Sequence, residues 1–192
     1  RTTLQSLAEQ KRKGELNFDR VVIETTGLAD PGPVAQTFFM DDEIAESFLL
    51  DSILTLVDAK HAAQQLNDRQ EARRQVGFAD QIFISKADLV SKSELEALQH
   101  RLTHMNPRAP QRQVHFGEVP IADVFDLRGF NLNAKLDIDP EFLAAADDHA
   151  HHDHGHDHGG HDHGHDHGHD HGHDHGHSHE NLNINAAVVH VI

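Results

Sequence analysis

The 192-residue chain contains no cysteine, tryptophan or tyrosine, and it has little positive charge. Without cysteine it can form neither a disulfide framework nor a thiolate zinc site. Its 16 basic side chains face 32 acidic ones, so we expect no basic surface for nucleic-acid phosphates. No apolar run approaches 18 residues and no basic, apolar leader opens the chain. These absences predict that the chain has neither a membrane-spanning helix nor a signal peptide. They also predict a cytoplasmic location.

The negative charge and the 21 histidines are unevenly distributed along the chain. Residues 147–179, the histidine tract, contain 16 histidines, eight aspartates and seven glycines, and no apolar side chain larger than alanine. Such a segment cannot bury enough apolar surface to offset the entropy lost on ordering, so we predict that it is disordered. Residues 1–146 contain every Lys and Arg of the chain. Their length and composition predict one globular domain. We expect residues 180–192 to begin a further, truncated segment.

Residues 1–146 alternate between helical and strand patterns. Strands that are apolar throughout, with helices between them, are typical of a parallel sheet covered on both faces. In such sheets ligands bind at the carboxyl ends of the strands, where this sequence has Glu24, Asp58 and the segment 85–88. The patterns predict strands over 21–23, 52–57, 81–84 and 114–116, and helices over 1–15, 31–39, 60–76, 92–104 and 121–127.

Two short motifs follow predicted strands. Glu24 leaves the first strand and could reach a magnesium ion, while Gly27 would let a backbone N–H approach a terminal phosphate. Lys86 and Asp88 follow the third strand; the aspartate could accept hydrogen bonds from the ring N–H and 2-amino group of guanine, with the lysine stem along the base. Taken singly, each motif is also compatible with an exposed strand end and a turn or helix entry. Their order and spacing favour a nucleotide site.

The chain resembles a known family over residues 1–143. Ile23-Glu24-Thr25-Thr26-Gly27-Leu28-Ala29-Asp30-Pro31 is similar to the Walker B segment of the CobW family, P-loop GTPases linked to metal insertion. Ser85-Lys86-Ala87-Asp88 stands where that family carries its guanine motif, and 128–131 and 137–139 resemble the end of its GTPase domain. The resemblance implies an α/β fold: a partial P-loop NTPase with a mainly parallel sheet flanked by helices, followed by a disordered His-rich tail.

The resemblance also implies a function. The family members act as GTP-hydrolysing metallochaperones, which would deliver zinc or cobalt to a metal-requiring client protein or to cofactor assembly. On this match Glu24 helps to hold Mg²⁺, Gly27 approaches the γ-phosphate of GTP, and Lys86 and Asp88 read guanine. Ser85 replaces the commoner asparagine, which removes one expected side-chain contact.

Two family motifs are absent from the sequence: the Gly-x-x-x-x-Gly-Lys-Ser/Thr phosphate loop and the Cys-x-Cys-Cys metal motif. Both would lie upstream of Arg1. We therefore expect a fragment that does not hydrolyse GTP alone, and whether this chain is itself an enzyme stays open.

The histidine tract repeats His-Asp-His-Gly. Neutral imidazoles bind Zn²⁺, Co²⁺ and Ni²⁺, and a glycine-rich chain can fold around an ion. The alternative is a solvated spacer with incidental metal affinity. The predicted ligands are His151, His152, His154, His156, His158, His161, His163, His165, His167, His169, His171, His173, His175, His177 and His179. The scattered body histidines, by contrast, are expected to be surface or helix residues: His61, His100, His104 and His115.

Residues 180–192 do not resemble the usual continuation of the CobW family. They are similar to the segment that follows the His-rich loop of cation-diffusion-facilitator zinc transporters and leads into a transmembrane helix, where His190 would match a metal ligand. Membrane contact is expected only if this segment begins such a helix. The alternative is a short strand of a divergent CobW C-terminal domain.

The sequence is therefore compatible with three alternative functions. The first is a fragment of a GTP-dependent metallochaperone. The second is a non-catalytic metal-buffering protein whose nucleotide fold is vestigial. The third is part of a zinc transporter fusion, with the repeat as a splice point between two metal-handling genes.

Overall fold

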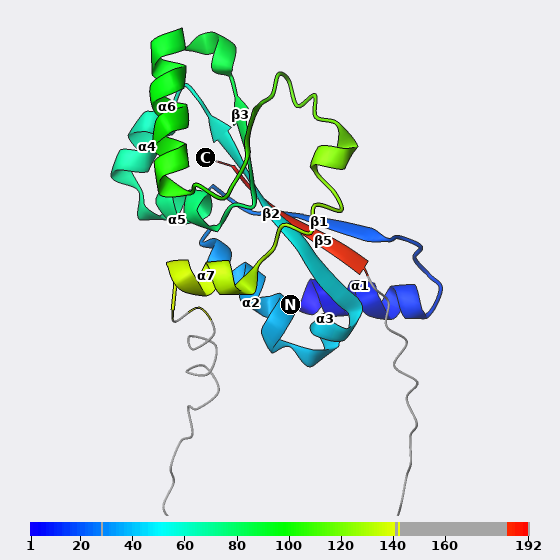
Figure 1. Cartoon of the computed structure of the whole chain (residues 1–192). Helices are drawn as coiled ribbons and strands as arrows, with labels where there is room; N and C mark the ends of the chain where they lie inside the picture. The colour runs from blue at the N-terminus through cyan, green and yellow to red at the C-terminus, as the bar shows by residue number, and fades with distance from the viewer. Residues whose placement is uncertain (28, 141, 143–183, 192) are drawn as a thin grey trace, which may run out of the picture.

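The computed structural model describes residues 1–27, 29–140, 142 and 184–191 (Figure 1). Within these residues the strands form one all-parallel sheet in the order β1-β5-β2-β3-β4. The predicted α/β class with a parallel sheet is confirmed. The strands span Arg20–Glu24 (β1), Phe48–Asp58 (β2), Gln81–Ser85 (β3), Gln111–Gln113 (β4) and Ile184–Val191 (β5).

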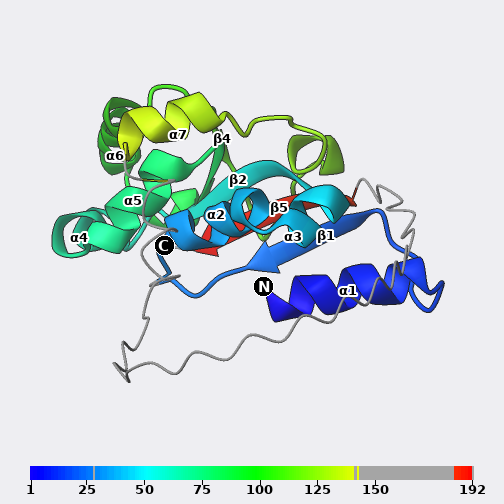
Figure 2. The ribbon, with the colours of Figure 1, turned by 90° about the horizontal axis from the view of Figure 1, so that it is seen from below.

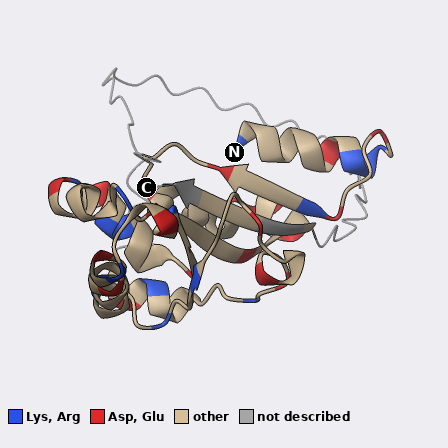
Figure 3. Cartoon of the chain, turned by 90° about the horizontal axis from the view of Figure 1, so that it is seen from above, with Lys and Arg blue, Asp and Glu red and all other residues tan. Residues whose placement is uncertain are grey.

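Helices connect the strands and cover much of the sheet. Figure 2 shows α1 running beside the sheet edge that β1 forms. The basic residues of α1 lie in its last turn, where they complement the helix dipole (Figure 3). The helices are Thr2–Arg12 (α1), Pro31–Met40 (α2), Asp42–Ser47 (α3), Ala62–Asp68 (α4), Gln70–Phe78 (α5), Lys92–Met105 (α6) and Leu132–Ile138 (α7), with 3-10 turns at Ala87–Leu89 and Ile121–Asp123.

The core follows the alternation of side chains along the strands. On β3, Ile82 and Ile84 pack against α4, α5 and α6, whereas Phe83 points to the opposite face. On that face Phe83 joins Leu54 of β2 and Val114, which follows β4. A third cluster joins α1, α2 and α3 to β2 and β5. The middle of β2 and of β3 is therefore buried on both faces, which explains their apolar sequences, whereas the edge strand β1 has one exposed face.

Local signals placed several elements well. Ser91 caps α6 and Glu94 completes the capping box, as the sequence predicts. The helix expected over 60–76 is instead two helices that meet at an extended Arg69. The strand expected over 114–116 lies three residues earlier, as β4, and the helix expected over 121–127 is only a 3-10 turn.

The last described segment corrects the expectation for residues 180–192. Residues 184–191 form β5, a strand paired in parallel with both β1 and β2, rather than the start of a transmembrane helix. Ile184, Ala187 and Val188 are fully buried in it. No helix among the described residues is long and apolar enough to cross a membrane. In the sequence, the histidine tract therefore lies between α7 and a strand of the same sheet.

Candidate nucleotide site at the carboxyl ends of the strands

The predicted site residues lie at one edge of the sheet. Glu24 is the last residue of β1, and Asp58 and Ser85 end β2 and β3, where they are register partners. Because the strands are parallel, all three carboxyl ends point the same way. The structure brings Asp58, Ser85 and Lys86 into contact, while β5 separates β1 from β2.

Lys86 begins the guanine-type motif in an unusual conformation. Its backbone is left-handed, with φ 55°, which turns the chain sharply from β3 into the 3-10 helix Ala87–Leu89. Its Nζ donates a 2.6 Å hydrogen bond to Oδ2 of Asp58, and the side chain stays half exposed. Ser85 Oγ donates to the carbonyl of Val57 at 3.2 Å. The turn is therefore tied to β2 through side chains on both of its first two residues.

Asp58 is the anchor of this arrangement. Its carboxylate also accepts hydrogen bonds from His61 Nδ1 and from the N–H of Lys60, each at 2.9 Å. Burial opposes its ionisation, but hydrogen bonds from Lys86, His61 and Lys60, together with the charge of Lys86, outweigh burial and lower its pKa from 3.8 to about 2. The sequence marked Asp58 as a strand end but did not assign it this role, and His61 is a partner of Asp58 as well as a surface residue.

This pKa gives the Asp58 cluster a defined pH dependence. Because the folded-state pKa is below the unfolded value, the stabilisation is fully present above pH 4 and is lost as the pH falls from about 4 to about 2. The shift corresponds to about 2 kcal/mol. Urea unfolding should therefore show the native chain to be more stable than Asp58→Asn at pH 7, with the difference shrinking below pH 4. A difference that stays constant over that interval would contradict the assignment.

Asp88 lies beside an open hollow. Its Oδ1 is 3.7 Å from Nδ1 of His115, and both side chains are more than half exposed. A hollow of about 330 Å³, which falls within the size range of small-molecule sites, is lined by Ala87, Asp88, Gln113, Val114 and His115. The carboxylate of Asp88 therefore borders space in which a planar base could bind.

The segment after β1 contains the other predicted contact, Gly27. We call residues 25–27 and 29–30 the Gly27 loop. Thr25 N–H donates to the carbonyl of Val189 on β5 at 3.0 Å, and Ala29 N–H donates to Thr26 at the same distance. Asp30 then caps α2 by accepting from the N–H of Gly32 at 2.9 Å. Glu24 is exposed at the start of this loop.

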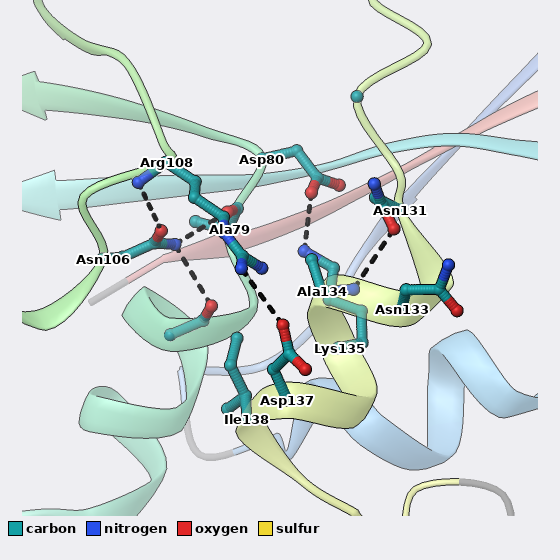
Figure 4. A pocket seen from close by; sticks show the side chains of 12 residues that line it. Ala79, Asp80, Asn106, Arg108, Asn131, Asn133, Ala134, Lys135, Asp137 and Ile138 are labelled. Atoms are coloured by element: carbon teal, nitrogen blue, oxygen red, sulfur yellow. Dashed lines mark hydrogen bonds and ion pairs between the residues drawn. The ribbon is translucent and has the colours of Figure 1, made fainter.

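A second polar pocket, of about 320 Å³, lies at the opposite end of β3 (Figure 4). Lys135 of α7 reaches into the domain, where its Nζ donates to Oδ1 of Asp80 at 2.6 Å and to the carbonyl of Phe78 at 2.7 Å. Burial raises the pKa of Asp80 in spite of the opposing charge of Lys135. Because Asp80 also accepts from Ile53 N–H at 2.8 Å, this pair fastens α7 to β2 and β3.

The predicted metal ligands of the histidine tract, from His151 to His179, lie outside the described residues. Within the described part of the chain, no group of three His, Asp or Glu side chains is arranged to hold a metal ion. Metal binding by the tract stays a prediction.

Comparison with known proteins identifies the family. The model of the CobW/HypB/UreG nucleotide-binding domain matches residues 1–113, which include both motifs. The chain belongs to this family. It is 41% identical over 145 residues to the zinc chaperone YjiA of Escherichia coli, covering 75% of this chain and 45% of that protein. It is 30% identical over 169 residues to the zinc-regulated GTPase metalloprotein activator 1 of Schizosaccharomyces pombe, covering 77% of this chain and 40% of the relative.

A solved structure supports the same assignment. The crystal structure of Zn(II)-bound YjiA GTPase from E. coli superposes with a TM-score of 0.62 and 42% sequence identity, over 67% of this chain and 40% of that one. The predicted fold class and the resemblance to the CobW family are thereby confirmed. The chain spans less than half the length of these relatives.

Proposed function

We propose that this chain supplies the guanine-reading part of a GTP-dependent zinc metallochaperone. The observation that carries the proposal is the contact between Lys86 and Asp58 at 2.6 Å, which fixes the turn that places Asp88 at the border of the hollow. Relatives described as zinc chaperones and GTPases support it.

The exposed residues fit a guanine nucleotide. The carboxylate of Asp88 can accept from the ring N–H and the 2-amino group of guanine, and the half-exposed Lys86 stem can lie along the base. Glu24 offers one carboxylate at the end of β1, and Mg²⁺ commonly takes one or two carboxylates together with phosphate oxygens. Bound Mg²⁺ would neutralise charge on the phosphates of GTP.

The cargo and the destination complete the proposal. The histidine tract would take up Zn²⁺, with Co²⁺ or Ni²⁺ as alternatives, because its imidazoles suit these ions. The metal would be delivered to a metal-requiring client protein in the cytoplasm. Since the sequence contains no phosphate loop, this chain by itself is expected not to hydrolyse GTP.

The test replaces Asp88 with asparagine in the chain extended at its N-terminus by a phosphate-loop segment. GTP affinity should fall roughly 100-fold, because the charge of the acceptor is lost and the asparagine NH₂ group replaces one of the two accepting oxygens, so that a donor faces a donor of guanine. The affinity for XTP, which has a carbonyl at position 2, should fall less than the affinity for GTP or should rise, since the asparagine amide can donate to that carbonyl. Affinities for GTP, XTP and ATP are measured by titration calorimetry.

The matched control is Asp137→Asn. Asp137 is an exposed aspartate that pairs with Arg108 beside the pocket of Figure 4, at the other end of β3. It should leave nucleotide preference unchanged. Equal GTP affinity in the Asp88 and Asp137 variants would contradict the base-reading assignment. Zinc uptake without any guanine-nucleotide binding by the extended chain would favour the metal-buffering alternative.

A further inference from the structure

A buried glutamine on α5 contacts the Gly27 loop. Gln75 is completely buried, a position at which an apolar side chain is usual. Its Nε2 donates to the carbonyl of Ala29 at 2.8 Å and to that of Gly27 at 3.4 Å. Its own backbone carbonyl accepts from Thr55 Oγ1 at 2.9 Å, which ties α5 to β2. The amide is thus held on a rigid element and reaches across 46 residues of sequence to the loop.

The carbonyl oxygen of the same amide could accept a hydrogen bond that it does not form here. Gln75 Oε1 is buried and has no hydrogen-bond partner among the described atoms. A buried acceptor without a donor needs a physical explanation. Because Nε2 of the same amide contacts two carbonyls of the Gly27 loop, Oε1 also lies beside this backbone segment.

The end of the loop is held separately. Asp30 forms an ion pair with Nε of Arg74 at 2.9 Å while it caps α2. The same guanidinium contacts Asp139 at 2.7 Å. The connection of the loop to α2 is therefore fixed by other side chains, and Gln75 acts on the stretch that includes Gly27.

We propose that Gln75 is a positioning residue that sets the orientation of the Gly27 loop toward the terminal phosphate of GTP. Nε2 holds the loop carbonyls in the arrangement seen here, and Oε1 accepts a loop N–H when Gly27 turns its own N–H toward the γ-phosphate. The inference rests on the proposed function. Because GDP lacks that phosphate, Gln75 should affect the binding of GTP and not that of GDP.

The test is Gln75→Met, which nearly preserves volume but has neither the donor nor the acceptor, in the chain extended by a phosphate-loop segment. Affinity for a non-hydrolysable GTP analogue should fall about tenfold, while affinity for GDP should stay within about twofold. Gln75→Glu keeps an acceptor but places a carboxylate against the loop carbonyls. It should lower the ratio of GTP-analogue affinity to GDP affinity as well, and it replaces the methionine variant in the test if that variant does not fold.

The matched control is Asn106→Leu. Asn106 is also a buried amide that donates to carbonyls, but its acceptors belong to Val76, Gly77 and Ala79 and not to the described residues of the Gly27 loop. It should lower the melting temperature and leave the ratio of GTP to GDP affinity unchanged.

The outcomes separate the two proposals. Equal weakening of both nucleotides by Gln75→Met, or no weakening of either, would overturn the role of Gln75 while Asp88→Asn still abolishes guanine preference. An unsubstituted extended chain that binds no guanine nucleotide would overturn the proposed function and this inference with it.

Discussion

Replacing Lys135 with methionine is expected to lower the free energy of unfolding by about 3 to 5 kcal/mol. The side chains of Lys135 and Asp80 are only 3% and 6% exposed, and their charged atoms are 2.6 Å apart. The methionine keeps the apolar stem but leaves the carboxylate of Asp80 buried without its cation, and the carbonyl of Phe78 loses a donor as well. Urea unfolding at pH 7, followed by circular dichroism, measures the loss.

Two further variants isolate the pair. Lys92→Met removes a lysine that is 89% exposed and 3.7 Å from Glu96, so the stability should change by less than about 0.5 kcal/mol. Adding Asp80→Asn to Lys135→Met removes the uncompensated charge and should recover much of the loss. Asparagine can still accept from the N–H of Ile53. A Lys135 variant as stable as the Lys92 variant would show that the pair does not fasten α7.

The second large effect is expected in β5. Val188→Asp should lower the free energy of unfolding by on the order of 4 kcal/mol or more, because a carboxylate would enter a position that is 1% exposed. Val188 pairs with Ile23 of β1 and Ile53 of β2, so the charge would lie in the middle of the sheet. Thermal unfolding and amide exchange of β1 and β2 are the measurements.

The control for β5 is Leu49→Asp. Leu49 is on the neighbouring strand β2 but is 62% exposed, so the same change of chemistry should cost less than about 1 kcal/mol. If Val188→Asp unfolds at the same temperature as the native chain, β5 does not hold the sheet together in solution.

Elements with strong local signals could be predicted from the sequence. The β-branched run before Glu24 predicts β1, and the pair Ser91 and Glu94 defines the start of α6. β5 could not be predicted as a central strand. Its apolar run is equally compatible with a buried strand and with a helix, and its pairing partners lie more than 120 residues earlier. Only the assembled sheet decides between the two.

The same distinction applies to the candidate site. The motif residues Lys86 and Asp88 could be predicted because a short spacing after a strand is visible in the sequence. The hydrogen bond between Lys86 and Asp58 joins residues 28 positions apart, and the one between Gln75 and Ala29 joins residues 46 positions apart. The sequence around Asp58 or Gln75 does not indicate these partners. In the sequence, Gln75 stands three residues after Ala72 and next to Val76, which places a polar side chain on the apolar face of a predicted helix.

The position of β5 limits how far the histidines can extend from the domain. Phe142 is buried against Phe78, and Ile184 is buried in the sheet, so the intervening chain is attached at both of its ends. Residues 143–183 would span at most ~140 Å if fully extended, but with both ends attached a histidine at their centre can travel only about half that distance. If the tract binds metal as proposed, a partner that collects the metal would have to approach to within roughly 70 Å of the sheet.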